Sequence, residues 1–447
     1  MKPLLALAQE LDSGTAVAAA LVDDALARAT QPSGEGRRVY LKLHADQARD
    51  AARASDRLRK AGTVPSSLAG IPFSVKDLFD LAGDVTSCAS RALADAPAAK
   101  DDALAIARLR RAGAVVIGRT NMTEFAYSGL GLNAHYDTPR NPWDRATGRI
   151  PGGSSSGAAV SVTDGMAAFA IGTDTGGSVR IPAALCGLTG FKPTARGVTK
   201  DGVFPLSTSL DSIGPLAPTV ACCALVDAVM RGAEPRIPEA PTLSGLRFGV
   251  PQSYVLDGLD RDVARAFATA LGALSAAGAR IVDVPFKSLA RIPELSPHGG
   301  VLAAEAYAVH RKLLETKGEI YDQRVRTRIM RGANLSAADY VDLIAARRAM
   351  IAEADATTAR FDAMLMPTVA IVAPPIAALD ADEKLYGETN LLVLRNTTVG
   401  NYLDRCALSI PCHERGDAPV GLMVMGETMG DDRLLAVGMA VEKALQD

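Results

Sequence analysis

The sequence has few aromatic residues, few histidines and no excess of charge of either sign. Its 447 residues include one tryptophan and five histidines, and 48 basic side chains stand against 50 acidic ones, for a formal net charge of −2. Without a basic excess, no overall field draws the chain to nucleic acid or to an anionic membrane surface. We therefore expect a small molecule as the partner, and neither nucleic acid nor a membrane.

The six cysteines and five histidines lack the spacings of metal or redox sites. No CxxC and no HxxxH occurs, so the sequence predicts no metal site. No stretch offers the roughly 18 uncharged apolar residues of a membrane span. Residues 1–30 follow an amphipathic helical pattern that includes acidic side chains, unlike a signal sequence. Because scattered thiols in a chain of this length are typical of a reducing compartment, we expect a cytoplasmic protein.

Apolar segments of strand length alternate with helical patterns along the chain. Residues 2–60 are predicted to be helical, with Gly62 as a stop. One apolar run precedes Lys76, and two others lie at 114–118 and at 166–173. All three are next to helical stretches, which favours an α/β fold with a parallel or mixed sheet. Further strands are expected at 246–251, within 361–376 and at 418–426, with the polar stretch 395–404 as a separator.

Two loops rich in glycine and serine interrupt this hydrophobic sequence. Residues 150–160 are IPGGSSSGAAV, and Ser178 lies in GTDTGGSVR, between an apolar strand and a small-residue helix. A turn from a strand into a helix, such as the one that carries Ser178, exposes a side chain while backbone N–H groups converge on one point, as an oxyanion requires. By itself, a Gly-Gly-Ser turn is more often a structural loop.

A serine nucleophile needs a base, and the sequence offers two candidates. Only His135 among the histidines lies near these loops in sequence, and nothing marks it as oriented by a carboxylate. Lys76 ends an apolar strand, where burial lowers the pKa of a lysine toward neutrality. The plain alternative is a surface lysine at a strand terminus.

These stretches together resemble the amidase signature family of serine hydrolases, which use a Ser-Ser-Lys triad. The spacing of Ser154 and Ser178 matches that of the family as well. The motifs that carry the resemblance follow in family order: GIPFSVKD (70–77), GRTNMTEFAYSGLG (118–131), PGGSSSGAAVSV (151–162), GTDTGGSVRIPAALCGLTGFKPT (172–194), SLDSIGPLA (209–217) and, more weakly, FDAMLMPT (361–368), SIPC (409–412) and APVGLMVMG (418–426).

The resemblance implies an α/β amidase-signature fold, in which a large twisted mixed β-sheet is covered by helices on both faces. It also implies a single amidase domain over residues 1–447. Within it we expect a helical N-terminal segment at 1–62, a signature core at 66–220 and a substrate-pocket part at 240–447. The proline-containing stretch 231–245 marks either a subdomain edge or a loop within one sheet, and the strand expected after it favours the loop.

By the same resemblance, Ser178 is the acyl-forming nucleophile and Lys76 the terminal base. Ser154 is the bridging serine, held behind a cis peptide bond from Gly153. No metal and no organic cofactor is implied. The oxyanion hole is expected to consist of the backbone N–H groups of Thr175, Gly176, Gly177 and Ser178.

Other residues receive weaker expectations. Ala126 and Tyr127 are expected to border the acyl pocket with Phe125, although an aromatic residue in such a loop is more often packing. Ser155 is expected at the substrate-binding site, where it either supports the triad with a hydrogen bond or caps a helix. Ion pairs and hydrogen bonds that fix the loops, rather than chemistry, are expected of Asp174, Arg180 and Asp211, and Cys88 is expected to be a packed thiol.

Three functions remain open. The first is an amidase acting on a small aliphatic or aryl amide. The second is the glutaminase subunit of a glutamyl-tRNA(Gln) amidotransferase, against which Met423 counts because that family usually has glutamine there. The third is a non-enzymatic binding protein on the same scaffold, which the filled triad positions disfavour. The acyl pocket is expected to be built by variable loops within 298–340 and 380–405, and the sequence leaves a homodimer open.

Overall fold

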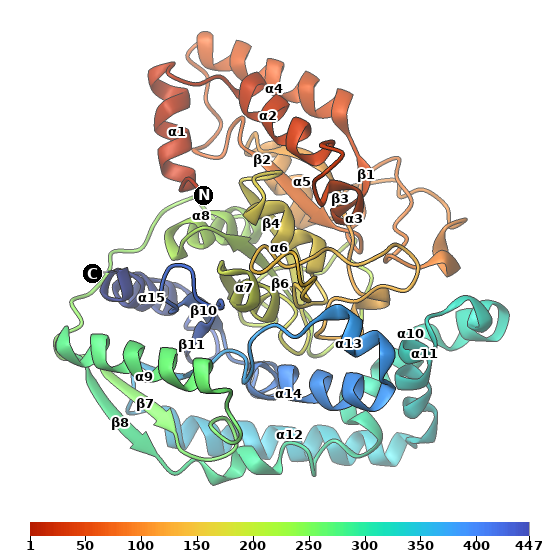
Figure 1. Ribbon diagram of the computed structural model, residues 1–447, viewed down its shortest axis with the longest axis vertical. Coiled ribbons are helices and arrows are strands. Elements are labelled where there is room, and N and C mark those ends of the chain that lie inside the picture. Colours follow the sequence, from red (N-terminus) through yellow and green to blue (C-terminus); the bar gives the residue numbers. More distant parts are fainter. Residues whose placement is uncertain (447) are drawn as a thin grey trace.

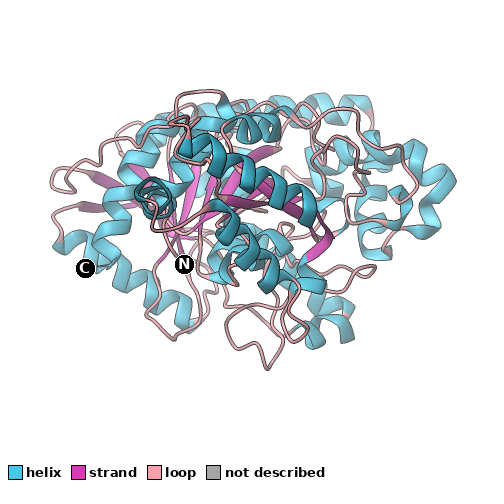
Figure 2. Ribbon diagram, turned by 90° about the horizontal axis from the view of Figure 1, so that it is seen from above, coloured by secondary structure: helices cyan, strands magenta, loops and turns pink. Residues whose placement is uncertain are grey.

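The computed structural model describes residues 1–446, and one large sheet organises them. Helices cover both faces of this sheet (Figure 2). Its eleven strands lie in the order β1-β3-β2-β4-β6-β5-β10-β11-β9-β7-β8. The strands are β1 (Tyr40–Leu43), β2 (Pro72–Lys76), β3 (Val115–Thr120), β4 (Phe169–Asp174), β5 (Thr189–Lys192), β6 (Ser212–Ala217), β7 (Arg247–Pro251), β8 (Arg280–Val284), β9 (Ala363–Pro367), β10 (Ala407–Pro411) and β11 (Gly421–Met425).

Helices are interspersed with the strands along the chain and are labelled where there is room in Figure 1. The α-helices within residues 1–446 are α1 (Leu4–Ser13), α2 (Ala18–Ala29), α3 (Gly36–Val39), α4 (Ala45–Lys60), α5 (Leu104–Arg111), α6 (Ser156–Thr163), α7 (Arg180–Cys186), α8 (Val220–Arg231), α9 (Arg261–Ala276), α10 (Gly300–Lys317), α11 (Gln323–Met330), α12 (Ala337–Thr358), α13 (Ile376–Ala381), α14 (Glu383–Tyr402) and α15 (Asp431–Gln446). None of these helices has the length and apolar character needed to cross a membrane.

The expected mixed sheet is confirmed, with parallel strands in two places. β2 pairs in parallel with both β3 and β4, and β7 pairs in parallel with β8 and β9. The remaining neighbours are antiparallel. β7 belongs to the same sheet as β6, so the stretch 231–245 is a connection within one sheet.

The prediction of a helical segment over 1–62 is wrong at one place. Tyr40–Leu43 forms the edge strand β1, which pairs antiparallel with β3, Leu43 lying opposite Gly118. Four residues are too few for a helical or strand period to be distinguished in the sequence. The hydrogen-bonding edge of β3 decides their conformation, because its backbone groups need partners.

The polar stretch 395–404 is also more than a separator. Its first eight residues belong to α14, a helix of 20 residues that packs against α7. The preceding strand is shorter than the apolar run 361–376, since only Ala363–Pro367 pairs in the sheet. α14 therefore brings a polar face from the C-terminal half of the chain to the centre of the molecule.

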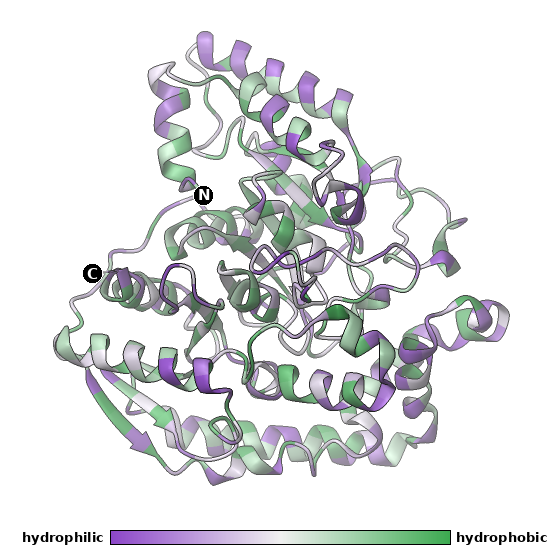
Figure 3. Ribbon diagram, viewed as in Figure 1, coloured by the Kyte–Doolittle hydropathy of each residue, from purple (hydrophilic) through white to green (hydrophobic). Residues whose placement is uncertain are grey.

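Small residues allow α6 to lie at the centre of the fold. Seven of its eight residues are buried, and a Cβ built at Gly157 would meet the Asn121 carbonyl oxygen at 2.7 Å. α4, in contrast, lies at the surface, where it buries Ala48 and Ala52 and carries many hydrophilic residues (Figure 3). The close approach of α6 matters because the loop at its start carries Ser154.

Candidate active site

Lys76, Ser154 and Thr173 meet at the carboxyl ends of β2 and β4. The Lys76 Nζ donates to Ser154 Oγ over 2.7 Å and to Thr173 Oγ1 over 2.9 Å. Lys76 and Ser154 are completely buried. The two parallel strands place their ends side by side, so the last residue of β2 lies next to the end of β4. The alternative of a surface lysine is thereby excluded.

Burial sets the ionisation of Lys76. Desolvation of the ammonium lowers its pKa to about 7, although the charges of Asp174 and Asp211 oppose this shift. No carboxylate within residues 1–446 forms an ion pair with its Nζ. A substantial fraction of Lys76 is therefore a free amine at neutral pH and can accept a proton.

The loop that carries Ser154 is packed tightly against residues 123–131. The peptide bond between Gly153 and Ser154 is cis. The Gly153 N–H donates to the Gly129 carbonyl at 2.8 Å, and Thr123 N–H donates to the Ser154 carbonyl at 3.1 Å. A Cβ at Gly153 would lie 2.5 Å from the Gly131 nitrogen, so only glycine fits there. These contacts fix the backbone of the loop at Ser154.

Ser178 lies in the turn between β4 and α7. The residue is 3% exposed, and within residues 1–446 its hydroxyl has no hydrogen-bond partner. The backbone hydrogen bonds of the described chain also leave free the N–H groups of Thr175, Gly176, Gly177 and Ser178. Unpaired backbone donors in a turn that carries a free hydroxyl suit an oxyanion site.

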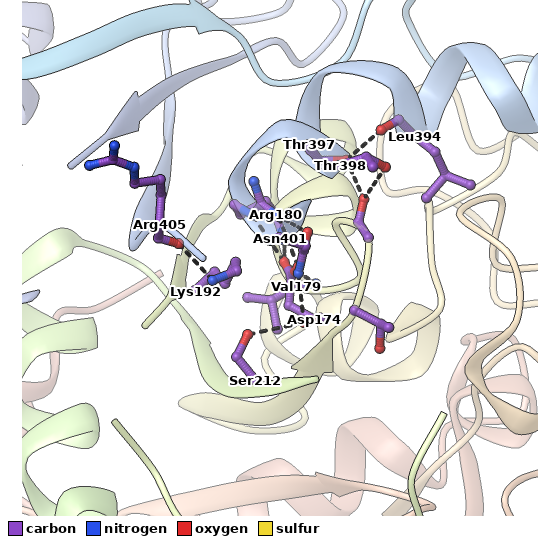
Figure 4. A network of polar contacts seen from close by, with 12 residues as sticks. Asp174, Val179, Arg180, Lys192, Ser212, Leu394, Thr397, Thr398, Asn401 and Arg405 are labelled. Carbon is purple, nitrogen blue, oxygen red and sulfur yellow. Dashed lines mark hydrogen bonds and ion pairs between the residues drawn. The ribbon is translucent and has the colours of Figure 1, made fainter. Parts of the chain in front are cut away.

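A buried ion pair joins the two residues that flank this turn, Asp174 and Arg180. The Asp174 carboxylate and the Arg180 guanidinium lie 2.9 Å apart, and neither side chain is exposed (Figure 4). Burial by itself raises the pKa of Asp174, but the charge and hydrogen bonds of Arg180 outweigh it and hold that pKa at about 2. The carboxylate also accepts from the Val179 N–H at 3.2 Å. The expected pairing of Asp174 with Arg180 is confirmed.

Asp211 supports the first residue of the same turn. Its carboxylate accepts from Thr175 Oγ1 at 2.5 Å and from the N–H groups of Leu206 and Ser207, each at 3.0 Å. Burial raises the pKa of Asp211 to about 6, because these donors only partly offset the loss of water. Asp211 therefore holds two loops together, as expected.

The residues expected around the triad differ in what they do. Ser155 Oγ reaches only the Thr173 carbonyl, at 3.5 Å, and makes no capping bond to α6, so neither expected hydrogen bond is present. Phe125 stacks on Tyr321 with ring centroids 4.8 Å apart, which is packing. Ala126 and Tyr127 are buried in the loop that also donates to the Ser154 carbonyl.

Two other expectations concern His135 and Cys88. His135 does have a carboxylate partner, since its Nε2 lies 2.9 Å from Glu124 Oε1. Nothing in the sequence indicated this pair, which forms through the tertiary fold and includes no bond to Ser154 or Ser178. Cys88 is fully buried and its pKa is raised by desolvation, as suits a packed thiol. Within residues 1–446, no group of three metal-ligating side chains gathers.

Sequence reasoning missed Thr173 and the contribution of α14. Asn401 Nδ2 donates to both the Asp174 carbonyl and Asp174 Oδ1, at 2.9 Å each. Thr397 Oγ1 donates to the Gly176 carbonyl at 2.6 Å (Figure 4). The spacing of Thr397 and Asn401, four residues apart, places both on one helix face. This spacing is the feature of the sequence that could have indicated a shared polar face, provided that 395–404 is assigned to a helix.

Comparisons to known proteins show which family the chain belongs to. A family model described as Amidase matches residues 22–435. The chain belongs to the amidase family. As a member, it is a hydrolase of carbon–nitrogen bonds in amides.

Three similar proteins illustrate the range of this amidase family. The chain is 37% identical to 2-amino-5-chloromuconic acid deaminase of Comamonas testosteroni, over 90% of this chain and 88% of that one. It is 34% identical to a glutamyl-tRNA(Gln) amidotransferase subunit of Roseiflexus sp. (strain RS-1), over 97% and 94%. A crystal structure of an amidase superposes with a TM-score of 0.88 at 32% identity, covering 99% of each chain.

Thr173→Val is expected to lower kcat/KM about tenfold, because the Lys76 amine loses one of its two hydrogen-bond partners. The ammonium loses an acceptor, so the pKa of Lys76 falls further and the acid limb of the pH profile moves to lower pH. Thr173→Ser keeps the hydroxyl and is the matched control. Wild-type kinetics in Thr173→Val would show that this contact has no part in turnover.

Proposed function

We propose that the protein hydrolyses the carboxylic amide of a small molecule to a carboxylate and ammonia or an amine. The reaction runs through an acyl-enzyme on Ser178, with Ser154 as the bridge and Lys76 as the base. The observation that carries this proposal is the completely buried Lys76, whose pKa is lowered to about 7 and whose Nζ lies 2.7 Å from Ser154 Oγ.

The first half of the reaction forms the acyl-enzyme. The neutral Lys76 amine takes the proton of Ser154, and Ser154 takes the proton of Ser178 as Ser178 Oγ bonds to the amide carbon. The N–H groups of residues 175–178 stabilise the negative charge on the carbonyl oxygen. The proton then returns through Ser154 to the amide nitrogen, and the carbon–nitrogen bond breaks.

The second half releases the carboxylate. Water gives a proton to the same relay and attacks the acyl carbon, and the bond from that carbon to Ser178 Oγ breaks. The hydroxyl of Ser178 regains its proton from Ser154. These steps balance without a metal or an organic cofactor.

The names of the relatives support two substrate classes. The deaminase from Comamonas testosteroni supports a small molecule that loses ammonia. The second candidate is the glutaminase subunit of a glutamyl-tRNA(Gln) amidotransferase, favoured by the 34% identity to the Roseiflexus protein. Met423 counts against this candidate, because the amidotransferase family usually has glutamine at this position. The Met423 side chain is fully buried, and its sulfur accepts from Arg180 Nη1 at 3.1 Å, so it faces the ion pair of Arg180.

A panel of amides separates these candidates. The purified protein alone is expected to release ammonia from one or more aliphatic or aryl amides. Turnover of glutamine alone, with no other amide accepted, would favour the amidotransferase function. No ammonia from any amide, together with no labelling of Ser178 by a fluorophosphonate, would favour the function of a non-enzymatic binding protein.

The six cysteines are all free thiols, which supports our proposal of a cytoplasmic enzyme.

The pH profile of kcat/KM is expected to rise through about pH 7 and to level off above it. Lys76 must be neutral to accept a proton, and its pKa is lowered to about 7, so activity is lost as the amine protonates at lower pH. Asp211→Asn is expected to move the midpoint to lower pH, because the Asp211 charge favours the ammonium of Lys76. The measurement needs a substrate that does not titrate in this range. A midpoint that stays in place in both Asp211→Asn and Thr173→Val would assign the limb to another group.

A further inference from the structure

We propose that Thr397 and Thr398 of α14 are positioning residues for the oxyanion site. They hold the peptide between Gly176 and Gly177 with its carbonyl toward α14 and its N–H on the opposite side. This inference rests on the proposed function, because it assigns the free N–H groups of the turn to the acyl oxygen of the substrate.

The hydrogen bonds to the Gly176 carbonyl are the first observation. Thr397 Oγ1 donates to this oxygen at 2.6 Å and Thr398 Oγ1 at 3.4 Å (Figure 4). Thr397 Oγ1 also lies 3.2 Å from the Leu394 carbonyl of its own helix, so the shorter bond is the one to Gly176. In a trans peptide the carbonyl and the N–H point in opposite directions. The Gly177 N–H is therefore turned away from α14.

Asn401 binds the carbonyl of Asp174, two residues before Gly176, in the same way. One turn after Thr397, its Nδ2 donates to the Asp174 carbonyl at 2.9 Å. α14 thus binds the carbonyl oxygens of residues 174 and 176, and the N–H groups of residues 175 and 177 face away from it. Both of these N–H groups are unpaired within residues 1–446. The Asp174 carbonyl also accepts from Ser212 Oγ of β6 at 3.0 Å, whereas the Gly176 carbonyl is bound by α14 alone within residues 1–446. A helix from the C-terminal half of the chain therefore determines which way the Gly177 N–H points.

The turn would not keep this arrangement by its own sequence. Gly176 and Gly177 lack Cβ atoms, so rotation of the peptide between them meets little steric resistance. Rotation would aim the Gly176 carbonyl, rather than an N–H, at a developing negative charge. Thr397 opposes it through the hydrogen bond and through contact, since a Cβ built at Gly177 would overlap the Thr397 hydroxyl.

α14 is itself anchored by two asparagines that precede Thr397 in the helix. Asn396 Nδ2 donates to the Val255 and Pro367 carbonyls at 2.9 and 2.8 Å. Asn390 Oδ1 accepts from the Gly129 N–H at 2.9 Å. These bonds fix the helix against the sheet and against the loop at 123–131, so the Thr397 hydroxyl presents a rigid donor to the turn.

The test is a set of threonine variants. Thr397→Val keeps the side-chain shape and removes the donor, and we expect kcat to fall about 10- to 100-fold with KM within about twofold, since a displaced oxyanion donor weakens transition-state binding. Thr397→Ser restores the donor and is expected to recover most of kcat. Thr398→Val is expected to cost less, because its bond is 3.4 Å long. Thr358→Val is the control, since that buried hydroxyl donates to the Ala354 carbonyl in α12.

A second readout does not depend on the amide. The rate at which a fluorophosphonate labels Ser178 is expected to fall in Thr397→Val and to recover in Thr397→Ser, because phosphonylation also develops charge on an oxygen beside Ser178. Wild-type kcat and labelling rate in Thr397→Val would overturn the inference, as would a rise in KM at unchanged kcat. A wild-type protein that is neither labelled nor active would instead contradict the proposed function.

Discussion

Ser178→Ala is expected to abolish amide hydrolysis, with a loss in kcat of at least about 10⁴-fold, because no other group takes over bond formation to the acyl carbon. The substitution leaves the fold intact. The Ser178 hydroxyl has no hydrogen-bond partner within residues 1–446, and its removal opens no core cavity. The melting temperature is therefore expected to stay close to that of the wild type.

Labelling by a fluorophosphonate measures this prediction independently of the substrate. The wild type is expected to be labelled at Ser178, and Ser178→Ala to remain unlabelled. Ser155→Ala is the matched control, since that serine lies in the neighbouring loop and its hydroxyl reaches only the Thr173 carbonyl. Labelling that persists in Ser178→Ala would move the nucleophile to another residue.

Lys76→Ala is expected to cost about 10²- to 10⁴-fold in kcat, the range over which general bases contribute. Ser154→Ala is expected to cost a similar amount, because the proton passes from one to the other across the 2.7 Å contact. The double variant should then be little worse than either single variant, since residues that act as one unit have non-additive effects. If the losses in log kcat instead add, Lys76 and Ser154 do not act as one unit.

A second buried lysine provides the control for Lys76. Lys192 is also completely buried, and desolvation lowers its pKa to about 8. Its Nζ donates only to the carbonyls of Pro193 and Arg405, at 2.9 and 2.6 Å, and not to a hydroxyl. Lys192→Met is therefore expected to lower the melting temperature and to retain the acid limb of the pH profile. In Lys76→Ala, the residual activity is expected to lack that limb.

The fold was predictable where the sequence pattern repeats over a whole element. The apolar runs that became β2 and β4 are continuous and end at charged or glycine-containing turns, so their conformation depends little on distant residues. The four residues of β1 were not predictable, because only the edge of β3 decides between strand and helix there. The length of β9 likewise depends on how far β11 accompanies it.

The candidate site divides in the same way. The sequence by itself determined the two glycine loops, Ser154 and Ser178 within them, and the lysine at the end of an apolar strand, because glycine content and strand termini are local properties. Only the tertiary structure decided that Lys76 is desolvated beside Ser154 and Thr173. It also brought Thr397 to the Gly176 carbonyl, across 221 positions of the chain. The pKa of a buried group and the direction of a peptide depend on what packs around them, which no local stretch of sequence contains.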